Sequence, residues 1–326
     1  MKAKILITTV PFGSANRLPL DLLENACVDY VVNPLGRKLS EDDLCKMIDD
    51  YDILIAGTEI ISSKVLDRSK KLKLISRVGV GLDGVDLNAA RSKNISVSYT
   101  PDAPAPAVSE LTIGLMFSLL RNVHAANLSM HRGNWNRFFG RRVSDVTVGI
   151  IGIGRIGSQV LNLVQKLEPK KILVNDLKEK NNVSGNIFWV DKQEIYENSD
   201  VITLHTPLLK DTQNMISYRE LLLMKNNALL INTSRGGIVN EADLERALRE
   251  GKIGGAAIDV FEQEPYQGNL AKLENCLLTS HMGSMSLDCR ARMEIEATEE
   301  ALRFINGEPL KNLVPEYEFL NQMRRD

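Results

Sequence analysis

Short apolar runs separated by polar, helix-like stretches recur along most of the chain. In the first hundred residues these runs read KILITTV, DYVVNP, DILIAGTE, KLKLISRVG and NISVSYT. A second series begins at Asp145 with VTVGIIGIG and continues through KKILVND, GNIFWV, DVITLH, ALLINTS, GGAAIDV and NCLLTSH. Such alternation is typical of βαβ units, in which helices connect parallel strands. The pattern therefore predicts an α/β protein with two doubly wound parallel sheets.

The two series are separated by a change in composition. The segment PDAPAPAV is rich in proline and alanine, and the apolar SELTIGLMFSLLR after it predicts a long buried helix. From about Leu287 the tail, with EIEATEEALRFINGEPL, predicts a helix that leads back across the molecule. We therefore expect a discontinuous first domain made of residues 1–102 and 287–326, with a second domain, residues 103–286, inserted between them.

Length and composition narrow the class of protein. A chain of 326 residues fits two domains of ordinary size, and a net charge of -2 gives no reason to expect nucleic acid or an anionic membrane as partner. The apolar start is broken by Pro11 and is too short for a secretion signal, so we interpret it as the first strand. No run approaches the ~20 apolar residues of a membrane span. The four cysteines show neither C-x-x-C pairing nor metal-ligand spacing with the four histidines, which indicates no metal site and a reducing, cytoplasmic setting.

A glycine motif opens the second series. Gly152, Gly154 and Gly157 form G-x-G-x-x-G directly after an apolar run and before the helical SQVLNLVQKL. Glycines there permit a tight turn, and the free N–H groups and positive dipole end of the helix face a pyrophosphate. Asp176 lies 19 residues beyond Gly157, where an acceptor for a ribose hydroxyl pair is expected. A carboxylate at this place repels the extra phosphate of NADP, so the motif predicts NAD.

Two alternatives remain at this stage. The motif by itself is also compatible with an ordinary glycine turn beside a solvated aspartate. His205, Thr206 and Pro207 follow the run DVITLH and add a third loop at the same expected sheet edge. His205 fits a cofactor contact, a chemical role, or a structural role in that turn.

Three chemically distinct side chains lie at or just beyond the ends of later apolar runs: Arg235, Glu264 and His281. In open α/β sheets the ligand crevice lies at the strand ends, so polar residues placed there point to chemistry. A guanidinium suits a carboxylate, an imidazole titrates near neutral pH, and Glu264 would orient the imidazole and stabilise its protonated form. This set suits hydride transfer between nicotinamide and a 2-keto acid. Taken singly, each residue could instead cap a loop, remain solvated or end a strand.

Together these segments carry a family resemblance. GIIGIGRIG, LLINTSRGGIVNEADL, AAIDVFEQEP and SHMGS, together with KLKLISRVGVGLDGVDL and AVSELTIGLMFSLLR, resemble the NAD-dependent D-2-hydroxyacid dehydrogenases, in particular the D-3-phosphoglycerate dehydrogenase-like branch. The resemblance spans nearly the whole chain. It implies a flavodoxin-like substrate domain, a Rossmann NAD-binding domain and a cleft between them. It also implies a homodimer, formed around the helix from Ser109 to Arg121 and the segment through Trp135.

The resemblance also implies roles for individual residues. Arg235, Glu264 and His281 take the places of the catalytic arginine, glutamate and proton-donating histidine. The backbone of Val78, Gly79 and Val80 would bind the substrate carboxylate, as would Arg235. The resemblance also implies cofactor contacts in addition to the glycines and the His205-Thr206-Pro207 loop. Arg155 and Ile156 would contact the pyrophosphate, and Asp176 the adenosine ribose. The contacts on the nicotinamide side would be Thr233, Ser234, Asp259, Gly283 and Ser284.

Some positions depart from the family pattern. Where many phosphoglycerate dehydrogenases carry an arginine, this chain reads Ala56-Gly57-Thr58-Glu59, although Arg77 is a possible substitute as phosphate ligand. Ser280 replaces the usual proline before the histidine. The chain ends at Asp326 without a regulatory amino-acid-binding domain, so serine feedback is not expected. The basic cluster Arg132, Arg137, Arg141 and Arg142 fits a solvated loop better than an anion site.

The leading hypothesis is an NAD-dependent D-2-hydroxyacid dehydrogenase, acting reversibly on a small 2-hydroxy or 2-keto acid such as 3-phosphoglycerate, glycerate, hydroxypyruvate or glyoxylate. One alternative is formate or phosphite oxidation on the same scaffold. Formate dehydrogenases of this superfamily pair the histidine with glutamine, so Glu264 argues against it. A second alternative is an NAD-sensing interaction protein similar to the family's transcriptional corepressors, which the lack of long disordered flanks disfavours.

Overall fold

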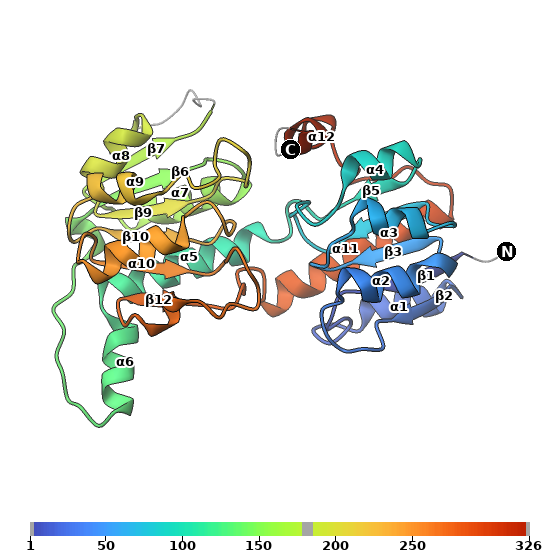
Figure 1. Ribbon diagram of the computed structural model, residues 1–326, viewed down its shortest axis with the longest axis horizontal. Helices are drawn as coiled ribbons and strands as arrows, with labels where there is room; N and C mark the ends of the chain where they lie inside the picture. The colour runs from blue at the N-terminus through green and yellow to red at the C-terminus, as the bar shows by residue number, and fades with distance from the viewer. Residues whose placement is uncertain (1–2, 178–184, 324–326) are drawn as a thin grey trace. The chain divides into compact units, whose positions relative to one another are not determined.

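The computed structural model describes residues 3–177 and 185–323. The chain divides into two compact units, Met1–Pro104 together with Met285–Asp326, and Ala105–Ser284. These limits lie within two residues of the boundaries expected at 102/103 and 286/287. Each unit is an α/β layer structure built on its own parallel sheet, as the alternating pattern predicted (Figure 1).

The first unit has a five-stranded parallel sheet with strand order β2-β1-β3-β4-β5. Its strands are β1 (Lys4–Ile7), β2 (Asp29–Val32), β3 (Ile53–Ala56), β4 (Leu74–Arg77) and β5 (Ser96–Ser98). Its helices are α1 (Leu18–Asn25), α2 (Glu41–Met47), α3 (Ser63–Arg68), α4 (Leu87–Ser92), α11 (Leu287–Ile305) and α12 (Glu316–Met323). The amino-terminal apolar run is thus a strand, and the predicted tail helix α11 packs against β3, β4 and α1.

The second unit has a seven-stranded parallel sheet with strand order β12-β11-β10-β9-β6-β7-β8. Its strands are β6 (Thr147–Ile151), β7 (Lys171–Asn175), β8 (Ile187–Trp189), β9 (Val201–Leu204), β10 (Leu229–Asn232), β11 (Gly255–Ile258) and β12 (Cys276–Leu278). Its helices are α5 (Ala105–Leu120), α6 (Val123–His131), α7 (Arg155–Lys166), α8 (Lys192–Asn198), α9 (Tyr218–Leu223) and α10 (Glu241–Arg249). All seven apolar runs of the second series are strands of this one sheet, which confirms that prediction.

Helices cover both faces of the larger sheet. Apolar side chains of α8, α9 and α10, including Ile195, Leu221 and Leu244, pack on one face. The other face is covered by α5 and α7, through residues such as Leu115 and Val160. The helix α7 buries Gly157, Val160 and Val164, and this spacing of three and four residues places them on one face. Strands buried on both faces explain the nearly continuous apolar runs of the sequence.

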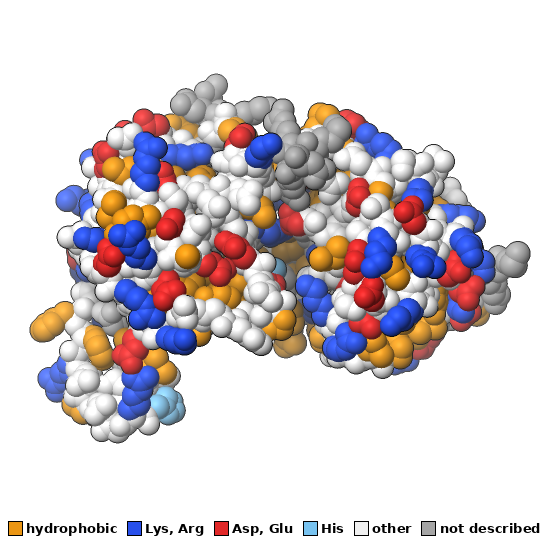
Figure 2. Space-filling view, viewed as in Figure 1, with side chains coloured by type: hydrophobic (Ala, Val, Ile, Leu, Met, Phe, Trp, Pro, Cys, Tyr) orange, Lys and Arg blue, Asp and Glu red, His pale blue; other side chains and the backbone are white. Residues whose placement is uncertain are grey.

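Charged side chains of both signs are interspersed over the face shown in Figure 2, in keeping with the small net charge. No helix within residues 3–177 and 185–323 is long and apolar enough to cross a membrane. The helix α6 and the segment after it project from the second unit (Figure 1), and Ser129 is the buried residue of α6.

Candidate active site

One edge of the larger sheet collects most of the residues singled out in its sequence. The parallel register aligns the last residues of the strands, with Ile151 opposite Leu204 and Asn175, and Asn232 opposite Leu204 and Ile258. The next residues along the chain therefore emerge side by side. These residues are Gly152, Asp176, His205, Thr233, Asp259 and Thr279. Loops from six neighbouring strands thus meet at one carboxyl edge, where ligands bind in open α/β sheets.

The glycine loop joins β6 to α7 and fits tightly against the loop after β9. Gly152 has φ +94, and a Cβ there would lie 2.5 Å from the carbonyl oxygen of His205. At Gly157 a Cβ would lie 1.9 Å from the carbonyl oxygen of Gly152. Gly154 is the N-cap of α7, has no side-chain cap, and has no atom within 4 Å of its Cβ position. Two glycines therefore form the turn, and the third leaves open space at the start of a helix.

Asp176 directly follows β7 and reaches the same loop. Its Oδ2 accepts a hydrogen bond of 2.6 Å from the backbone N–H of Ile153. The carboxylate thus lies beside the glycine turn at the carboxyl edge of the sheet. This is the place that the sequence predicted for an acceptor of ribose hydroxyls.

His205 lies behind the glycine loop. The backbone N–H of His205 donates to the carbonyl oxygen of Ile151 at 2.7 Å, and its ring Nε2 lies 2.9 Å from Thr203 Oγ1. Burial lowers the pKa of His205 to about 3, so the ring is neutral at physiological pH. Within the described part of the chain, buried His205 Nδ1 and Thr206 Oγ1 have no hydrogen-bond partner. Two unpaired polar atoms beside the loop suggest contact with a ligand or water, whereas a proton-transfer role for His205 is not supported.

These features fit a dinucleotide. The uncapped start of α7 offers N–H groups to a pyrophosphate, and Gly154 leaves room for its approach. Asp176 supplies the ribose acceptor, and the unpaired atoms of His205 and Thr206 lie on the adjacent loop. The residues present at this edge can therefore hold NAD.

The loop after β10 carries Arg235 and is shaped by a buried asparagine. Asn232 Oδ1 accepts hydrogen bonds from the N–H and the Oγ of Ser234, and its Nδ2 donates to the carbonyl oxygen of Arg235 at 2.9 Å. Arg235 Nη1 donates to the carbonyl oxygen of Ser234 at 2.6 Å. Thr233 Oγ1 lies 2.8 Å from Thr112 Oγ1 of α5. The backbone of this loop is thus held from inside the sheet, and the guanidinium is half-buried at its edge.

The structure brings together Glu264 and His281, which are 17 residues apart in sequence. Imidazole Nδ1 lies 2.9 Å from both carboxylate oxygens of Glu264. The side chains are 41% and 29% exposed for His281 and Glu264, so the ring faces solvent on one side and the carboxylate on the other. Because Nδ1 is engaged by the carboxylate, Nε2 is the ring atom left to exchange a proton with a ligand.

The loop carrying Glu264 is held by its neighbours. Glu264 Oε1 accepts from the N–H of Phe261 at 3.2 Å, and the rings of Phe261 and Tyr266 stack at 4.2 Å. Glu241, the first residue of α10, accepts from the N–H of Glu262 at 2.8 Å. Burial raises the pKa of the Glu241 carboxyl. The sequence around Glu241 does not distinguish it from an ordinary acid in the first turn of a helix.

Asp259 has a role that the sequence did not reveal. It is 1% exposed, and its carboxylate accepts hydrogen bonds from Thr279 Oγ1 and from the N–H groups of Met282 and Gly283. Asp259 therefore holds the loop that carries His281. The sequence signal available for this role was only a carboxylate at the end of an apolar run. Ser284 ends this loop and lies at the border of the second unit.

In the first unit, the loop after β4 contains Val78, Gly79 and Val80. Thr100 Oγ1 accepts from the N–H of Gly79 at 2.7 Å, and the N–H of Thr100 donates to the carbonyl oxygen of Gly79 at 3.1 Å. The Arg77 guanidinium is buried and donates to the carbonyl oxygen of Val78. Arg77 thus holds this loop from inside, which does not support its use as a phosphate ligand.

Glu59 is also buried in the first unit, at 3% exposure. Its Oε1 accepts from Thr8 Oγ1 and, at 3.1 Å, from the N–H of Gly57. These contacts lie at the carboxyl ends of β1 and β3, so a carboxylate occupies the segment where the resemblance would place an arginine.

The basic cluster is partly engaged within the second unit. Arg132 pairs with Glu274, while Arg141 lies 3.4 Å from Asp200 and donates to the carbonyl oxygen of Asn227 at 2.7 Å. Both pairings agree with a structural surface rather than an anion site. No group of three or more His, Cys, Asp or Glu side chains suited to a metal was found in the described part of the chain.

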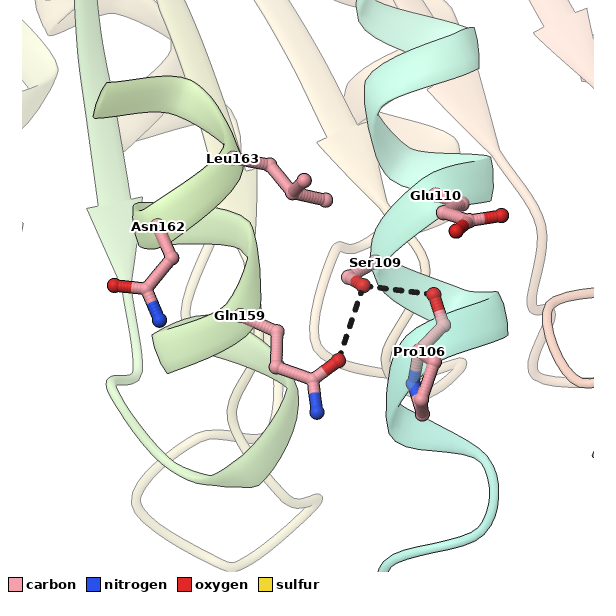
Figure 3. Close-up of a pocket in the computed structure, with 6 residues that line it drawn as sticks. All are labelled: Pro106, Ser109, Glu110, Gln159, Asn162 and Leu163. Atoms are coloured by element: carbon pink, nitrogen blue, oxygen red, sulfur yellow. Dashed lines mark hydrogen bonds between the residues drawn. The ribbon is translucent and has the colours of Figure 1, made fainter. Parts of the chain in front are cut away.

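A separate cavity of about 190 Å³ lies between α5 and α7. Figure 3 shows the side chains of Ser109 and Gln159 pointing toward each other across the gap between the helices, with Oγ to Oε1 at 3.4 Å. The lining residues are Pro106, Ser109, Glu110, Gln159, Asn162 and Leu163. Ligand pockets usually have volumes of ~300–1,000 Å³, so this cavity is small. It contains none of the candidate catalytic side chains.

Comparisons with known proteins indicate the family of the chain. The sequence model of a family described as D-isomer specific 2-hydroxyacid dehydrogenase, NAD binding domain, matches residues 113–283. The chain is 38% identical over 283 residues to a D-3-phosphoglycerate dehydrogenase of Methanocaldococcus jannaschii, covering 85% of this chain and 54% of that protein. It is 34% identical over 301 residues to a glyoxylate reductase of Thermofilum pendens, covering 89% of this chain and 88% of that protein. The chain thus spans about half the length of the first relative and most of the second.

A solved structure shows the same fold over nearly the whole chain. The TT0316 protein from Thermus thermophilus superposes with a TM-score of 0.88 at 31% identity. The match covers 96% of this chain and 100% of that one.

Proposed function

The chain belongs to the D-isomer-specific 2-hydroxyacid dehydrogenase family, and we propose that it catalyses reversible hydride transfer between NAD(H) and a small 2-hydroxy or 2-keto acid. The contact between Glu264 and His281 Nδ1 is the observation that carries this proposal. It provides an oriented proton donor in the same unit, and at the same sheet edge, as the glycine loop that fits NAD. A proton donor at a carbonyl is needed for keto-acid reduction and not for formate oxidation.

Each of the three side chains has a distinct task. The guanidinium of Arg235 binds the substrate carboxylate and polarises the neighbouring carbonyl through its fixed fork of donors. His281 gives a proton from Nε2 to the carbonyl oxygen during reduction and takes it back during oxidation. Glu264 keeps the ring oriented through Nδ1 and stabilises the imidazolium. When bound, NAD(H) supplies or accepts the hydride.

We further propose that the cofactor is held by the uncapped start of α7, Asp176 and the loop after β9. The resemblance also assigns substrate carboxylate binding to the backbone of Val78, Gly79 and Val80. The position of Glu59 and the internal contacts of Arg77 favour a substrate without a phosphate group. Two such substrates are glyoxylate, which the name of the Thermofilum pendens relative also suggests, and hydroxypyruvate.

A spectrophotometric screen tests the function. NADH oxidation is followed with glyoxylate, hydroxypyruvate, phosphohydroxypyruvate, pyruvate and bulkier 2-keto acids, and NAD reduction is followed with formate. We expect turnover with at least one 2-keto acid and loss of most of it in Arg235→Ala, with partial retention in Arg235→Lys. Tight NADH binding without turnover of any 2-keto acid contradicts the proposal, as does NAD reduction by formate as the principal activity.

We propose that the protein is a homodimer that uses α6 and the segment after it. Large apolar side chains there are exposed: Val123 at 53%, Met130 at 51%, Trp135 at 76% and Phe139 at 103%. Figure 2 shows hydrophobic side chains on this projecting part of the second unit. Exposed apolar surface of this kind usually marks an interface.

Light scattering after gel filtration tests the dimer. We expect a mass of twice 36.3 kDa for the wild type and a shift toward 36.3 kDa for the double variant Trp135→Ser with Phe139→Ser. The matched control is Phe188→Ser, which removes a 46% exposed phenylalanine of β8. A wild-type mass of 36.3 kDa contradicts the proposal.

We also propose a cytoplasmic location. The cysteine pattern of the sequence, without C-x-x-C pairs, supports a reducing compartment.

A further inference from the structure

The backbone of His281 needs external support. Its φ is +52, in the left-handed region that residues other than glycine adopt rarely. Its side chain is 41% exposed, so core packing alone does not hold the ring. Hydrogen bonds of the residues before and after His281 in the chain help to hold its loop.

Asp259 supplies those contacts. Its carbonyl oxygen accepts from the N–H of His281 at 2.8 Å. Carboxylate Oδ1 accepts from Thr279 Oγ1 at 2.6 Å and from the N–H of Met282 at 2.9 Å, and Oδ2 accepts from the N–H of Gly283 at 2.9 Å. One buried side chain thus binds residues before and after the histidine.

The donors around this carboxylate are neutral. No ion pair of Asp259 with a lysine, arginine or histidine is present among residues 3–177 and 185–323. A buried carboxylate without a cation depends on each hydrogen-bond donor, and an O–H donor at 2.6 Å is a short one. Among the groups that donate to the Asp259 carboxylate, Thr279 donates from its side-chain hydroxyl, whereas Met282 and Gly283 donate from the backbone. A substitution at Thr279 can therefore remove one hydrogen-bond donor without changing the backbone.

We propose that Thr279 is a positioning residue for His281, acting through the Asp259 carboxylate; this inference rests on the proposed function. The Thr279 hydroxyl orients the carboxylate, which fixes the loop of residues 279–283. The loop in turn sets the distance from His281 Nδ1 to Glu264 and the place of Nε2 at the substrate oxygen. Displacement of a catalytic group by ~1 Å can cost ~100-fold in rate.

Three substitutions isolate the hydroxyl. Thr279→Val replaces it by a methyl group of similar size, Thr279→Ala supplies a second deletion should the valine variant fold poorly, and Thr279→Ser restores the O–H. Ser280→Ala is the matched control at the exposed neighbouring position. We expect kcat with a 2-keto acid to fall ~10–100-fold in the valine and alanine variants, and to stay within ~3-fold of wild type in the serine variant. The Kd for NADH should change by less than ~3-fold, because the contacts proposed to hold the cofactor, at the start of α7, at Asp176 and in the loop after β9, lie on other loops than Thr279.

A second readout does not depend on turnover. The chain has four histidines, so isotope-labelled histidine gives few ring signals, and His281→Ala identifies the one that belongs to His281. In Thr279→Val the His281 ring resonances should move toward those of a solvent-exposed imidazole, while His124, His131 and His205 stay unchanged. In Thr279→Ser the His281 signals should return toward wild type.

The outcomes separate the two proposals. Wild-type kcat and wild-type His281 resonances in the valine or alanine variant overturn the positioning role. So does a fall in kcat that is matched by loss of NADH binding or that serine does not rescue. If the wild-type protein turns over no 2-keto acid, the proposed function fails, and the resonance shift of His281 still decides whether Thr279 positions the ring.

Discussion

The glycine motif predicts two opposite responses to the same small change. Gly157→Ala and Gly154→Ala each add one methyl group at the start of α7. At Gly157 the new Cβ would lie 1.9 Å from the carbonyl oxygen of Gly152, whereas at Gly154 no atom lies within 4 Å. The first variant should therefore disturb the fold of the second unit, and the second should leave it intact and disturb cofactor binding.

The magnitudes follow from these distances. At Gly157 the loop or the helix must move by about 1 Å or more, and overpacking of this kind costs ~1–3 kcal/mol of unfolding free energy. For a unit of this size that lowers the Tm by ~2–12 °C. Gly154 has φ -76 and ψ -153, which alanine can adopt. At this position alanine is a poorer N-cap than glycine, which lowers the free energy of unfolding. It also reduces the entropy of the unfolded chain, which raises that free energy. Each effect is under ~1 kcal/mol, so the two nearly cancel.

Thermal unfolding and NADH fluorescence titration measure both effects on the same preparations. For Gly154→Ala we expect a Tm within ~2 °C of wild type and a Kd for NADH raised ~10-fold or more, which corresponds to ~1.4 kcal/mol. Wild-type affinity in Gly154→Ala would refute the placement of the pyrophosphate at the start of α7. An unchanged Tm in Gly157→Ala would refute the tight contact between the two glycines.

Two further predictions concern neighbouring residues. Asp176→Ser should raise the affinity for NADPH relative to NADH by ~10-fold or more, because it removes the carboxylate that repels the extra phosphate; an unchanged preference in paired titrations would place the ribose elsewhere. His205→Gln should flatten the pH dependence of stability. The folded pKa of His205 is about 3, below the ordinary ~6.5, so the unfolded state binds more protons and wild-type stability falls as the pH drops below ~6.5. Between pH 7 and pH 5 the wild type should lose ~1–2 kcal/mol more than the variant in urea unfolding, and equal losses would show that His205 is not buried in its neutral form.

Local sequence pattern predicted the strands because most of them are buried and nearly continuous in apolar residues. Runs such as VTVGII and ALLIN fit strands of a sheet that is covered on both faces, and they form β6 and β10. The glycine loop was predictable for the same local reason, since its chemistry lies within six consecutive residues. The ends of later apolar runs grouped Arg235, Glu264 and His281, which are distant in sequence, and the family resemblance then implied a role for each.

Contacts between distant loops were not predictable from local pattern. The hydrogen bonds of Asp259 to Thr279, Met282 and Gly283 join two strand ends whose pairing is known only from the sheet order. Nothing near Arg77 indicates that its guanidinium turns back to the carbonyl oxygen of Val78. The neutral state of His205 likewise depends on burial behind the glycine loop, which the sequence does not show.

The central claim is that His281, oriented by Glu264, exchanges a proton with the oxygen of a 2-keto acid. The most direct test is the rate of NADH oxidation by His281→Ala on the best substrate of the screen, with NADH binding titrated in the same preparation. The account predicts a fall in kcat of ~100-fold or more with the NADH Kd unchanged. Wild-type turnover in this variant would contradict it.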